Sequence, residues 1–383
     1  MKESLKTVAY AEGKGFLSPI DEIIEELRNG RMIILVDAED RENEGDLVVA
    51  AQMATPDSIN FMAKHGRGLV CLSITPQRAD QLRLEYMARH NEARHRTAFT
   101  VSIEAREGIA TGISAHDRAR TIATAIDPTK DHKDIVSPGH VFPLIARQGG
   151  VLVRAGHTEA SVDLARLAGL YPAGVICEIM NDDGTMARMP DLVAFAQRHA
   201  LKVGTIEDLV GYRVRHDRIV KQVMKSSLES AFGGRFVLHV YETTVEPVEH
   251  LALAMGDLRA PGPVLVRVHA VNPLADLLGV GSDVADGSMI EKAMQAIAKE
   301  GRGVIVLIRD LRPKFASDFI QQRAQRRPAR KVQERRIVEN GIGCQILRDL
   351  GVSDMVLLSN SPPSRYVGLE AFGLRIVGQR RLA

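Results

Sequence analysis

The sequence of 383 residues has no tryptophan, few aromatic residues and three widely separated cysteines, Cys71, Cys177 and Cys344. This spacing excludes a CxxC-type metal knuckle, and an odd number of cysteines argues against a disulfide framework. No stretch approaches the roughly 18 uninterrupted apolar residues of a membrane-spanning helix, and MKESLKTVAYAEGKGF at the start lacks the apolar core of a signal peptide. We therefore expect a soluble, cytoplasmic protein with no membrane partner.

An excess of charge of one sign is also missing. The 50 Lys and Arg residues against 48 Asp and Glu residues leave a formal net charge of +2, far from the basic excess typical of nucleic-acid binding. We therefore expect no nucleic-acid partner. The length exceeds what one hydrophobic core usually serves and predicts two domains, which we place at residues 1–212 and 213–383 because the sequence pattern changes there.

The first domain mixes apolar helical stripes with short β-branched runs. Residues 18–30 predict a helix capped by Ser18, with Ile20, Ile23, Ile24 and Leu27 on one apolar stripe. The same reasoning predicts further strands at 31–37, 68–75, 99–105 and 149–156, and a strand that leads into a turn over 175–184. Further helices are predicted at 75–87, at 158–170 with Thr158 as a cap, and from Leu192 to His199. The fold class expected is α+β, a mixed sheet with flanking helices.

The second domain alternates strands and helices more regularly. Strands are predicted at 236–244, 262–271, 303–310 and 354–359, and helices at 285–300 and 340–351. This alternation predicts an α/β fold. A polar interruption at 311–336 includes a cluster of seven basic residues between Arg323 and Arg336, which form either a solvated face or a site for an anion or nucleic acid.

The stretch DAEDRENEGD, residues 37–46, follows the apolar run RMIILV and contains Glu39, Asp40, Glu42, Glu44 and Asp46. Carboxylate oxygens are the protein ligands that Mg²⁺ prefers. The interleaved arginine and asparagine favour a binding loop, and the alternative is an ordinary solvated acidic loop.

Three further segments carry candidate chemistry. In RAGHTEASVD, residues 154–163, Arg154 and His157 precede a helix whose N-terminus could bind a phosphate, although an isolated histidine is more often a structural residue. In SPGHVFPL, residues 137–144, His140 follows Pro-Gly in an expected tight turn. Glu178 lies within the apolar run VICEIM, where burial would raise its pKa toward acid/base use, and a partly exposed position on an edge strand is the equally weighted alternative. GISAHDRARTIATAID, residues 112–127, is typical of a capped helix start.

Taken in order, DRENEGD, CLSIT, TGISAHDRA, SPGHVFPL, RAGHTEASVDL and PAGVICEIMNDDGTMAR resemble 3,4-dihydroxy-2-butanone 4-phosphate synthase of riboflavin biosynthesis across residues 15–205. The resemblance implies Mg²⁺-dependent, or Mn²⁺-dependent, conversion of the sugar phosphate D-ribulose 5-phosphate into 3,4-dihydroxy-2-butanone 4-phosphate and formate. It also implies a homodimer with active sites at the subunit interface.

Site residues follow from matching these motifs. The implied metal ligands are Glu42 and His157, and the implied catalytic residues are His140 and Glu178, with Glu44 and Asp46 as helpers. The substrate-binding positions implied are Arg41, Glu42, Asp46, Arg154, Ala155, Gly156, His157, Thr158 and Glu178.

Residues 264–378 contain VLVRVHA, AIAKEGRGVIVLIRD, GIGCQILRDLG and LLSNSPPSRYVGLEAFGLRIVG, which are similar to GTP cyclohydrolase II. The family's three zinc-binding cysteines fall on Asn272, Asp283 and Ala285, so we expect no zinc and no opening of GTP. Its Asp-x-Arg pair falls on Arg336 and Val338, its second Glu-Gly-Arg motif is replaced by residues 310–312, and its lysine falls near Ser364.

The leading hypothesis is a monofunctional synthase whose second domain is structural or regulatory. The alternatives are a bifunctional synthase and cyclohydrolase, which stoichiometric zinc would support, and a non-catalytic scaffold of riboflavin enzymes, which the intact motifs at Glu42, His140, His157 and Glu178 disfavour.

Overall fold

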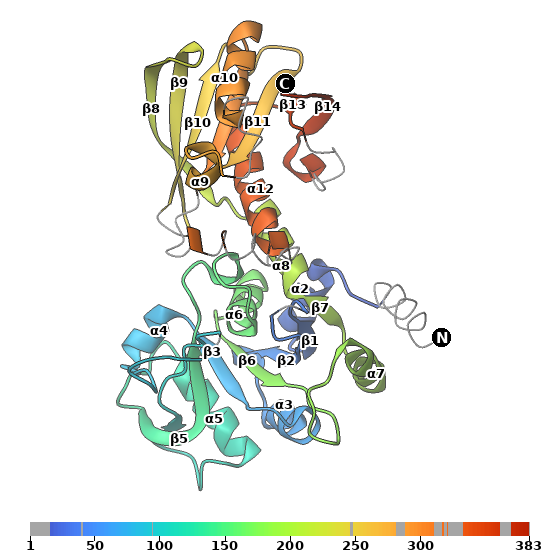
Figure 1. The fold of residues 1–383 in the computed structure, drawn as a ribbon. Helices are drawn as coiled ribbons and strands as arrows, with labels where there is room; N and C mark the ends of the chain where they lie inside the picture. Colours follow the sequence, from blue (N-terminus) through green and yellow to red (C-terminus); the bar gives the residue numbers. More distant parts are fainter. Residues whose placement is uncertain are drawn as a thin grey trace. The chain divides into compact units, whose positions relative to one another are not determined.

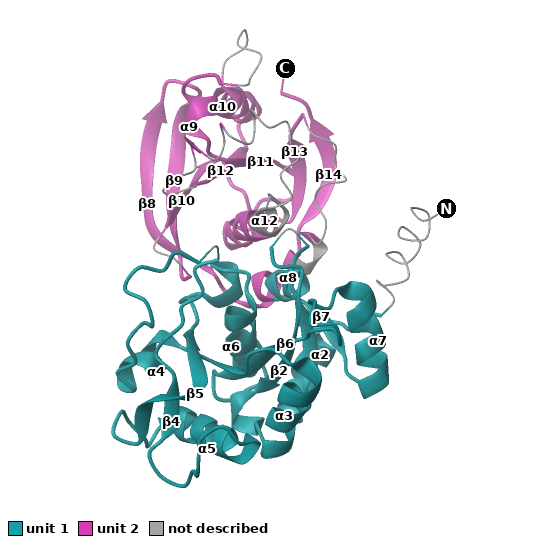
Figure 2. Ribbon diagram, turned by 60° about the horizontal axis from the view of Figure 1, so that its bottom comes forward, with its two compact units in different colours: residues 1–212 teal, residues 213–383 magenta. Residues whose placement is uncertain are grey.

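The computed structural model of the chain describes residues 16–39, 41–93, 95–245, 248–280, 288–309, 316–317, 320, 332–360 and 369–382. It divides into two compact units, Met1–Tyr212 and Arg213–Ala383 (Figure 2). Each unit contains one seven-stranded sheet with helices packed on it (Figure 1). Among the described residues, no helix has the length and apolar character needed to cross a membrane.

The sheet of unit 1 is mixed, as expected. Its strands are β1 Ile33–Val36, β2 Gly45–Ala50, β3 Cys71–Ile74, β4 Ile103–Ala105, β5 Ile135–Ile145, β6 Gly174–Glu178 and β7 Val203–Thr205, in the order β4-β5-β3-β6-β2-β1-β7. β1 pairs with β7 and β3 with β5 in parallel, whereas the other neighbours are antiparallel. The central strands β2, β3 and β6 carry the site described below.

Helices cover both faces of this sheet (Figure 1). They are α2 Ile20–Arg28, α3 Pro56–Phe61 continued by the π-helix η2 Met62–Gly66, α4 Pro76–Gln81, α5 Ala115–Ile126, α6 His157–Leu167, α7 Met189–His199 and α8 Ile206–His216, with 3₁₀ turns η1 Ala51–Met53 and η3 Gly150–Leu152. The stripe of four apolar residues predicted for α2 is buried.

Strand alternation decides which side chains face α6. Leu47 of β2 and Cys177 of β6 point into the core cluster that includes Ile59 of α3 and Ile122 of α5. Because neighbouring side chains in a strand point to opposite faces, Asp46 and Glu178 point toward α6 instead. A Cβ placed on Gly174, on the same face, would lie 2.5 Å from Cβ of Ser161 in α6, which shows how closely this helix packs.

Residues 149–156 do not form the predicted strand. Gly149 and Gly150 adopt φ values of 91° and 64°, and the carboxylate of Asp163 accepts a hydrogen bond from the backbone N–H of Val151, so the chain turns into η3. Positive φ is incompatible with a strand, and the pair of glycines permits it. Helix α6 then begins at His157 after Gly156, which makes Thr158 an internal residue rather than the cap.

Other boundaries also differ. SPGHVFPL lies within β5 rather than in a tight turn. Helix α2 starts after Pro19 without a side-chain cap from Ser18, and the helix predicted for 75–87 ends at Gln81, with Arg83 at φ 51°. The strand predicted at 99–105 is regular only over Ile103–Ala105.

Unit 2 has the α/β organisation expected, with an antiparallel addition. Its strands β8 Val220–Ser230, β9 Gly234–Thr243, β10 Glu249–Met255, β11 Val264–Ala270, β12 Gly303–Ile308, β13 Asp354–Leu358 and β14 Arg375–Arg380 follow the order β14-β13-β11-β12-β10-β9-β8. The four strands β11 to β14 are parallel to their neighbours in this group, whereas β8, β9 and β10 are antiparallel, and the sequence analysis missed β8, β10 and β14.

The helices of unit 2 are α9 Pro273–Asp276, α10 Met289–Glu300, α12 Val332–Asp349 and the 3₁₀ turn η5 Leu369–Phe372. Ile297 of α10 packs in a core cluster with Leu265 and Ile305 on one face of the sheet. Helix α12 packs on the opposite face, to which the side chain of Val268 points: a Cβ added to Gly343 of α12 would lie 2.9 Å from Cγ1 of Val268. The side chains of the basic cluster at 323–336, and residues Asp283, Ala285, 310–312 and Ser364, lie outside the described residues.

A buried arginine closes the C-terminal end of α5. Arg78 of α4 is 2% exposed, and its guanidinium donates hydrogen bonds to the carbonyl oxygens of Ala125, Asp127 and Lys130 at 2.6, 2.8 and 3.1 Å. The last carbonyls of a helix have no partner within the helix, so this side chain satisfies groups that burial would otherwise leave unpaired.

We predict that Arg78→Ala lowers the free energy of unfolding by about 3 kcal/mol, because carbonyl groups bound to one charged donor lose it together. Urea unfolding of the full chain measures this. Arg89→Ala, which removes an exposed guanidinium, serves as the control, and an equal effect of the two substitutions would contradict the assigned role of Arg78.

Candidate active site

The acidic segment connects two antiparallel strands, since Val36 of β1 pairs with Gly45 of β2. Asp37, which is 6% exposed, organises this connection: its carboxylate accepts hydrogen bonds from the backbone N–H groups of Glu42 and Glu44 at 3.1 and 2.8 Å. Arg41 Nη1 lies 2.8 Å from the same carboxylate. The sequence analysis missed Asp37, although an aspartate just after a strand often bonds to nearby backbone N–H groups.

His157 brings the start of α6 to this loop. Its Nε2 atom lies 3.1 Å from the carbonyl oxygen of Leu35 and 3.8 Å from Oδ1 of Asp46. One potential ligand atom from each of Asp37, Glu42 and His157 lies within 4.8 Å of the others. The structure therefore brings both sequence-predicted metal ligands together and adds Asp37.

This donor set fits a hard divalent cation. Carboxylate oxygens suit Mg²⁺ and Mn²⁺, and an imidazole must be neutral to act as a ligand. Burial lowers the pKa of His157, which favours that neutral form. Arg41 also hydrogen-bonds Glu42, so in this conformation the charge of that carboxylate is balanced by the guanidinium.

Asp46 and Glu178 occupy directly opposed positions on β2 and β6. Asp46 is 3% exposed, and its Oδ1 atom accepts no hydrogen bond from the described residues. Burial, followed by the charges of Glu178 and Glu44, raises the pKa of Asp46 well above its ordinary value. Burial also raises the pKa of Glu44, with a further contribution from Glu42. Both pKa shifts are toward the protonated form.

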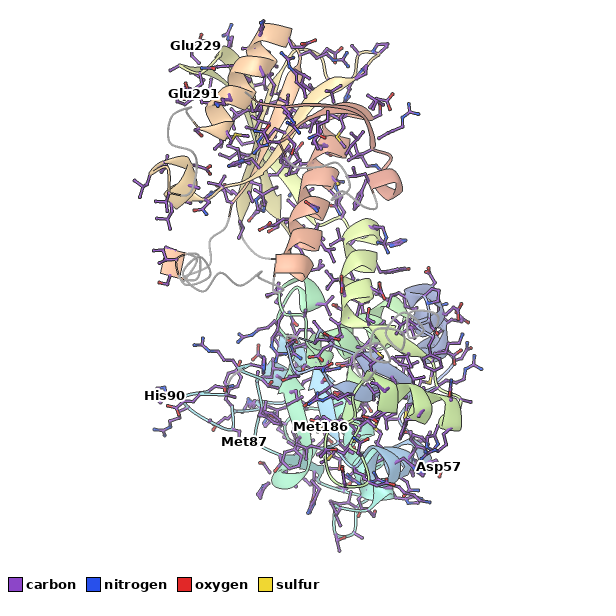
Figure 3. The ribbon with its side chains drawn as sticks, turned by 45° about the vertical axis from the view of Figure 1, so that its right-hand side comes forward. Asp57, Met87, His90, Met186, Glu229 and Glu291 are labelled. Atoms are coloured by element: carbon purple, nitrogen blue, oxygen red, sulfur yellow. The ribbon has the colours of Figure 1, made fainter. Side chains whose placement is uncertain are left out.

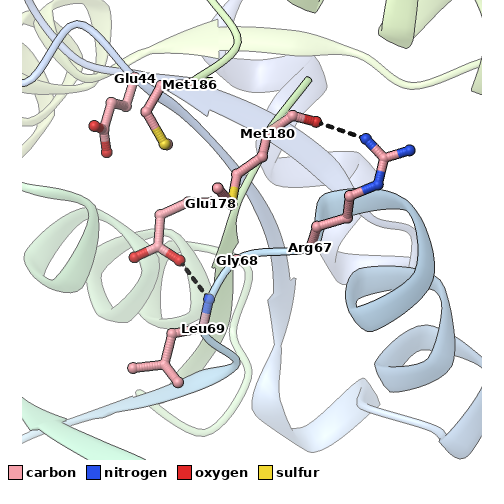
Figure 4. A pocket seen from close by; sticks show the side chains of 7 residues that line it. All are labelled: Glu44, Arg67, Gly68, Leu69, Glu178, Met180 and Met186. Atoms are coloured by element: carbon pink, nitrogen blue, oxygen red, sulfur yellow. Dashed lines mark hydrogen bonds between the residues drawn. The ribbon is translucent and has the colours of Figure 1, made fainter. Parts of the chain in front are cut away.

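A pocket of about 390 Å³ opens beside these carboxylates (Figure 4). It is lined by Glu44, Arg67, Gly68, Leu69, Glu178, Met180 and Met186. Glu178 Oε2 accepts a hydrogen bond of 2.8 Å from the backbone N–H of Leu69, as Figure 4 shows. A Cβ on Gly68 would lie 2.5 Å from the same oxygen, so a side chain there would displace the glutamate.

Two arginines flank the start of α6. A Cβ on Gly156 would lie 2.5 Å from Nη1 of Arg154 and 2.8 Å from Nη2 of Arg41. Glu159 and Thr97 hold the Arg154 guanidinium through contacts of 2.6 and 2.9 Å. Two guanidinium groups beside a helix N-terminus form a favourable place for an anion, and the neighbouring Ala155 and Thr158 belong to the same segment.

His140 lies apart from this cluster. Its imidazole Nδ1 bonds the carboxylate of Glu104 on β4, a partner that the sequence analysis missed, and its side chain is 44% exposed. Cys71 of β3 pairs with both Phe142 of β5 and Ile176 of β6. Continuing this register places His140 and Glu178 at the same level with one strand between them, about 10 Å apart.

The comparisons with known proteins identify the family of the chain. The profile of the family described as 3,4-dihydroxy-2-butanone 4-phosphate synthase matches residues 21–212. The chain belongs to this synthase family. A second profile, described as GTP cyclohydrolase II, matches residues 221–381.

Full-length relatives of this synthase share both units. The "Riboflavin biosynthesis protein RibBA" of Aquifex aeolicus is 50% identical over 94% of this chain and 90% of its own length. The "3,4-dihydroxy-2-butanone 4-phosphate synthase" of Pseudomonas aeruginosa is 48% identical over 94% of this chain and 98% of its own. The chain is accordingly a 3,4-dihydroxy-2-butanone 4-phosphate synthase, a lyase of riboflavin biosynthesis.

Solved structures agree with the fold, and one of them contains magnesium. A structure described as RibBX, a two-domain synthase from A. baumannii, has 42% identity and a TM-score of 0.77, and the match covers 96% of this chain and 99% of that one. A synthase described in complex with two magnesium ions has 41% identity and a TM-score of 0.51, over 52% of this chain and 99% of that one.

We predict that Asp46→Asn stabilises the metal-free synthase at pH 8 and raises Tm by about 2–4 °C. Because the pKa of Asp46 is raised in the folded state, the folded chain holds this proton more tightly than the unfolded chain, and stability falls as pH rises above about 4. The variant lacks this pH-dependent loss.

Thermal unfolding in EDTA between pH 4 and pH 8 measures the difference. Asp80→Asn, at an exposed position in α4, is the control. A gap between wild type and Asp46→Asn that stays constant across this range would contradict the assignment.

Proposed function

We propose that unit 1 converts D-ribulose 5-phosphate into 3,4-dihydroxy-2-butanone 4-phosphate and formate with Mg²⁺, which Mn²⁺ can replace. The observation that carries the proposal is the convergence of the loop after β1, the start of α6 and the end of β6. This convergence combines the candidate ligands Asp37, Glu42 and His157 with an anion site and the facing carboxyl groups of Asp46 and Glu178.

The substrate phosphate binds at the start of α6, between Arg41 and Arg154. The backbone of Ala155 and Gly156 and the side chain of Thr158 complete this site. Glu159 restricts the Arg154 guanidinium through a 2.6 Å contact, so little conformational freedom is lost when the phosphate binds. The bound phosphate then fixes the position of the sugar carbons relative to Glu44 and Glu178 in the pocket.

Proton transfer is assigned to carboxyl and imidazole groups around the sugar. Enolisation, loss of water, rearrangement and release of formate each require a proton to move. Glu178 and His140 are the catalytic pair, and Glu44 and Asp46, whose pKa values are raised, assist as proton donors. A divalent cation held by Glu42 and His157 supplies Lewis-acid stabilisation of negative charge on the sugar oxygens.

The position of His140 favours a homodimer with active sites at the interface. Within one chain its contact is with Glu104, not with the metal-site cluster. Leu69, Tyr86, Met87 and Ile113 are 40, 60, 51 and 55% exposed, and Met87 and His90 lie on a segment that projects from unit 1 (Figure 3). Large exposed apolar side chains are typical of association surfaces.

Unit 2 is proposed to be structural or regulatory, with no zinc and no GTP-opening activity. Its sequence contains a single cysteine, Cys344, which is buried in α12 and has its thiol pKa raised to about 12 by desolvation. Three thiolate ligands cannot be assembled from one cysteine. Asn272, at one of the expected zinc positions, instead caps α9 through its side-chain oxygen.

Two other functions remain as alternatives. The match of the GTP cyclohydrolase II profile over residues 221–381 supports a bifunctional enzyme. A non-catalytic scaffold has less support, since the candidate ligands and carboxylates of unit 1 are assembled. The three buried free cysteines fit a reducing cytoplasm, where we place the protein.

The test is formate release by the purified full chain, measured with ribulose 5-phosphate plus Mg²⁺ and separately with GTP plus Zn²⁺. We expect formate from the sugar phosphate alone, abolished by EDTA and restored by Mg²⁺ or Mn²⁺. Formate from GTP would establish the bifunctional alternative, and silence in both assays would establish the scaffold.

We predict that Glu178→Gln lowers kcat at least 100-fold and leaves KM within about threefold, because a proton-transfer group acts mainly in the transition state. Glutamine retains an oxygen that can accept the N–H of Leu69, so the pocket keeps its shape. Steady-state kinetics measure both constants, with exposed Glu85→Gln as the control. A change confined to KM would contradict the catalytic assignment.

A further inference from the structure

Arg188, which is not among the predicted site residues, contacts the acidic loop of residues 37–46. It immediately precedes α7, and its Nη1 atom donates hydrogen bonds to the carbonyl oxygens of Glu42, at 2.8 Å, and of Asn43. Asn43 has a left-handed backbone, with φ 54°, which is an uncommon conformation for a residue other than glycine. One guanidinium thus fixes two consecutive carbonyl groups at the turn of the loop.

Arg188 is itself held in place. Its backbone N–H donates to the Asp191 carboxylate at 2.9 Å, and its carbonyl accepts from the N–H of Leu192 at 2.9 Å. Leu192 is fully buried, and a Cβ on Gly45 would lie 2.5 Å from its Cδ1 atom. Helix α7 therefore packs directly against the first residue of β2, where the acidic loop ends.

The C-terminal part of α7 packs against α3 and η2, which lead to the pocket. His199 of α7 lies with ring centroids 5.0 Å from Phe61 and 4.9 Å from His65, and Phe195 lies 6.3 Å from Phe61. The π-helix that contains His65 runs into Arg67 and Gly68 of the pocket wall. Contacts at both ends thus restrict where α7, and with it Arg188, can lie.

We propose that Arg188 is a positioning residue that holds the backbone of Glu42 and Asn43 in the conformation required for divalent-cation binding. The inference rests on the proposed function, because it assumes that Glu42 is a ligand. Glu42 lies in a turn, where its N–H donates to Asp37 and its carbonyl oxygen accepts a hydrogen bond from Arg188. With both ends of the residue fixed, the carboxylate is presented at little entropic cost.

The proposal is tested by Mn²⁺ binding to the full-length protein without substrate, followed by electron paramagnetic resonance of the free ion. We expect Arg188→Ala to raise Kd about tenfold and Arg188→Lys to raise it about threefold, since an ammonium is a poorer match for two carbonyls. Arg198→Ala, which removes an exposed arginine from the same helix, is expected to bind Mn²⁺ like wild type.

Kinetics add a readout that general damage to the fold would not reproduce. With Arg188→Ala, the Mg²⁺ concentration for half-maximal activity is expected to rise about tenfold, with KM for ribulose 5-phosphate at saturating Mg²⁺ within about twofold of wild type. Excess Mg²⁺ should then restore much of the activity.

The outcomes separate this proposal from the one on which it rests. Wild-type Mn²⁺ affinity in Arg188→Ala, or an equal loss in Arg198→Ala, overturns the role of Arg188 and leaves the proposed function standing. A wild-type protein that binds no Mn²⁺ overturns the metal site itself. If Arg188→Ala does not fold, Arg188→Lys decides: unchanged affinity refutes the proposal, and weakened affinity with an unchanged Tm supports it.

Discussion

The register between β2 and β6 is the constraint on which the site depends, because it sets Asp46 directly opposite Glu178. Two carboxyl groups at such positions repel each other when ionised, and burial adds a desolvation cost. The opposite face of the same strands offsets these costs, since Leu47 and Cys177 point into the main core. A slip of one residue would exchange the two faces, so core packing holds the carboxyl groups together.

Because of this register, the segment that contains Gly68 and Leu69 lies in close contact with Glu178 in the pocket. Glu178 ends β6 where residues 66–69 run beside it, with Arg67 paired antiparallel to Ile179, and its side chain accepts a hydrogen bond from the backbone N–H of Leu69. Gly68 permits that contact because no Cβ intrudes. On the other side, α6 delivers His157 and the segment after Arg154 to the same face. The candidate metal ligands, the two arginines beside α6 and the facing carboxyl groups of Asp46 and Glu178 thus share one end of one sheet.

The sequence predicted the acidic loop, the segment from Arg154 to Thr158 and Glu178 as parts of one site because short-range composition and a family resemblance both mark them. Asp37 and Glu104 were not predicted, since their roles depend on hydrogen bonds to residues that only folding brings close. The strand predicted at 149–156 failed for the opposite reason. Its apolar residues fit a strand, but Gly149 and Gly150 adopt positive φ and Asp163 stabilises the turn from within α6.

The packing of unit 2 does not depend on which activity, if any, the unit has. Its sheet is held by packing of α10 against Leu265 and Ile305, and these contacts require no metal. Near the end of β11, the Nε2 atom of His269 lies 2.9 Å from the carboxylate of Asp276, which connects α9 to the strand. Protein hydrogen bonds here stabilise a segment that, in a zinc enzyme of this family, would carry thiolates. These contacts account for the fold of unit 2, and its activity must be argued from its site.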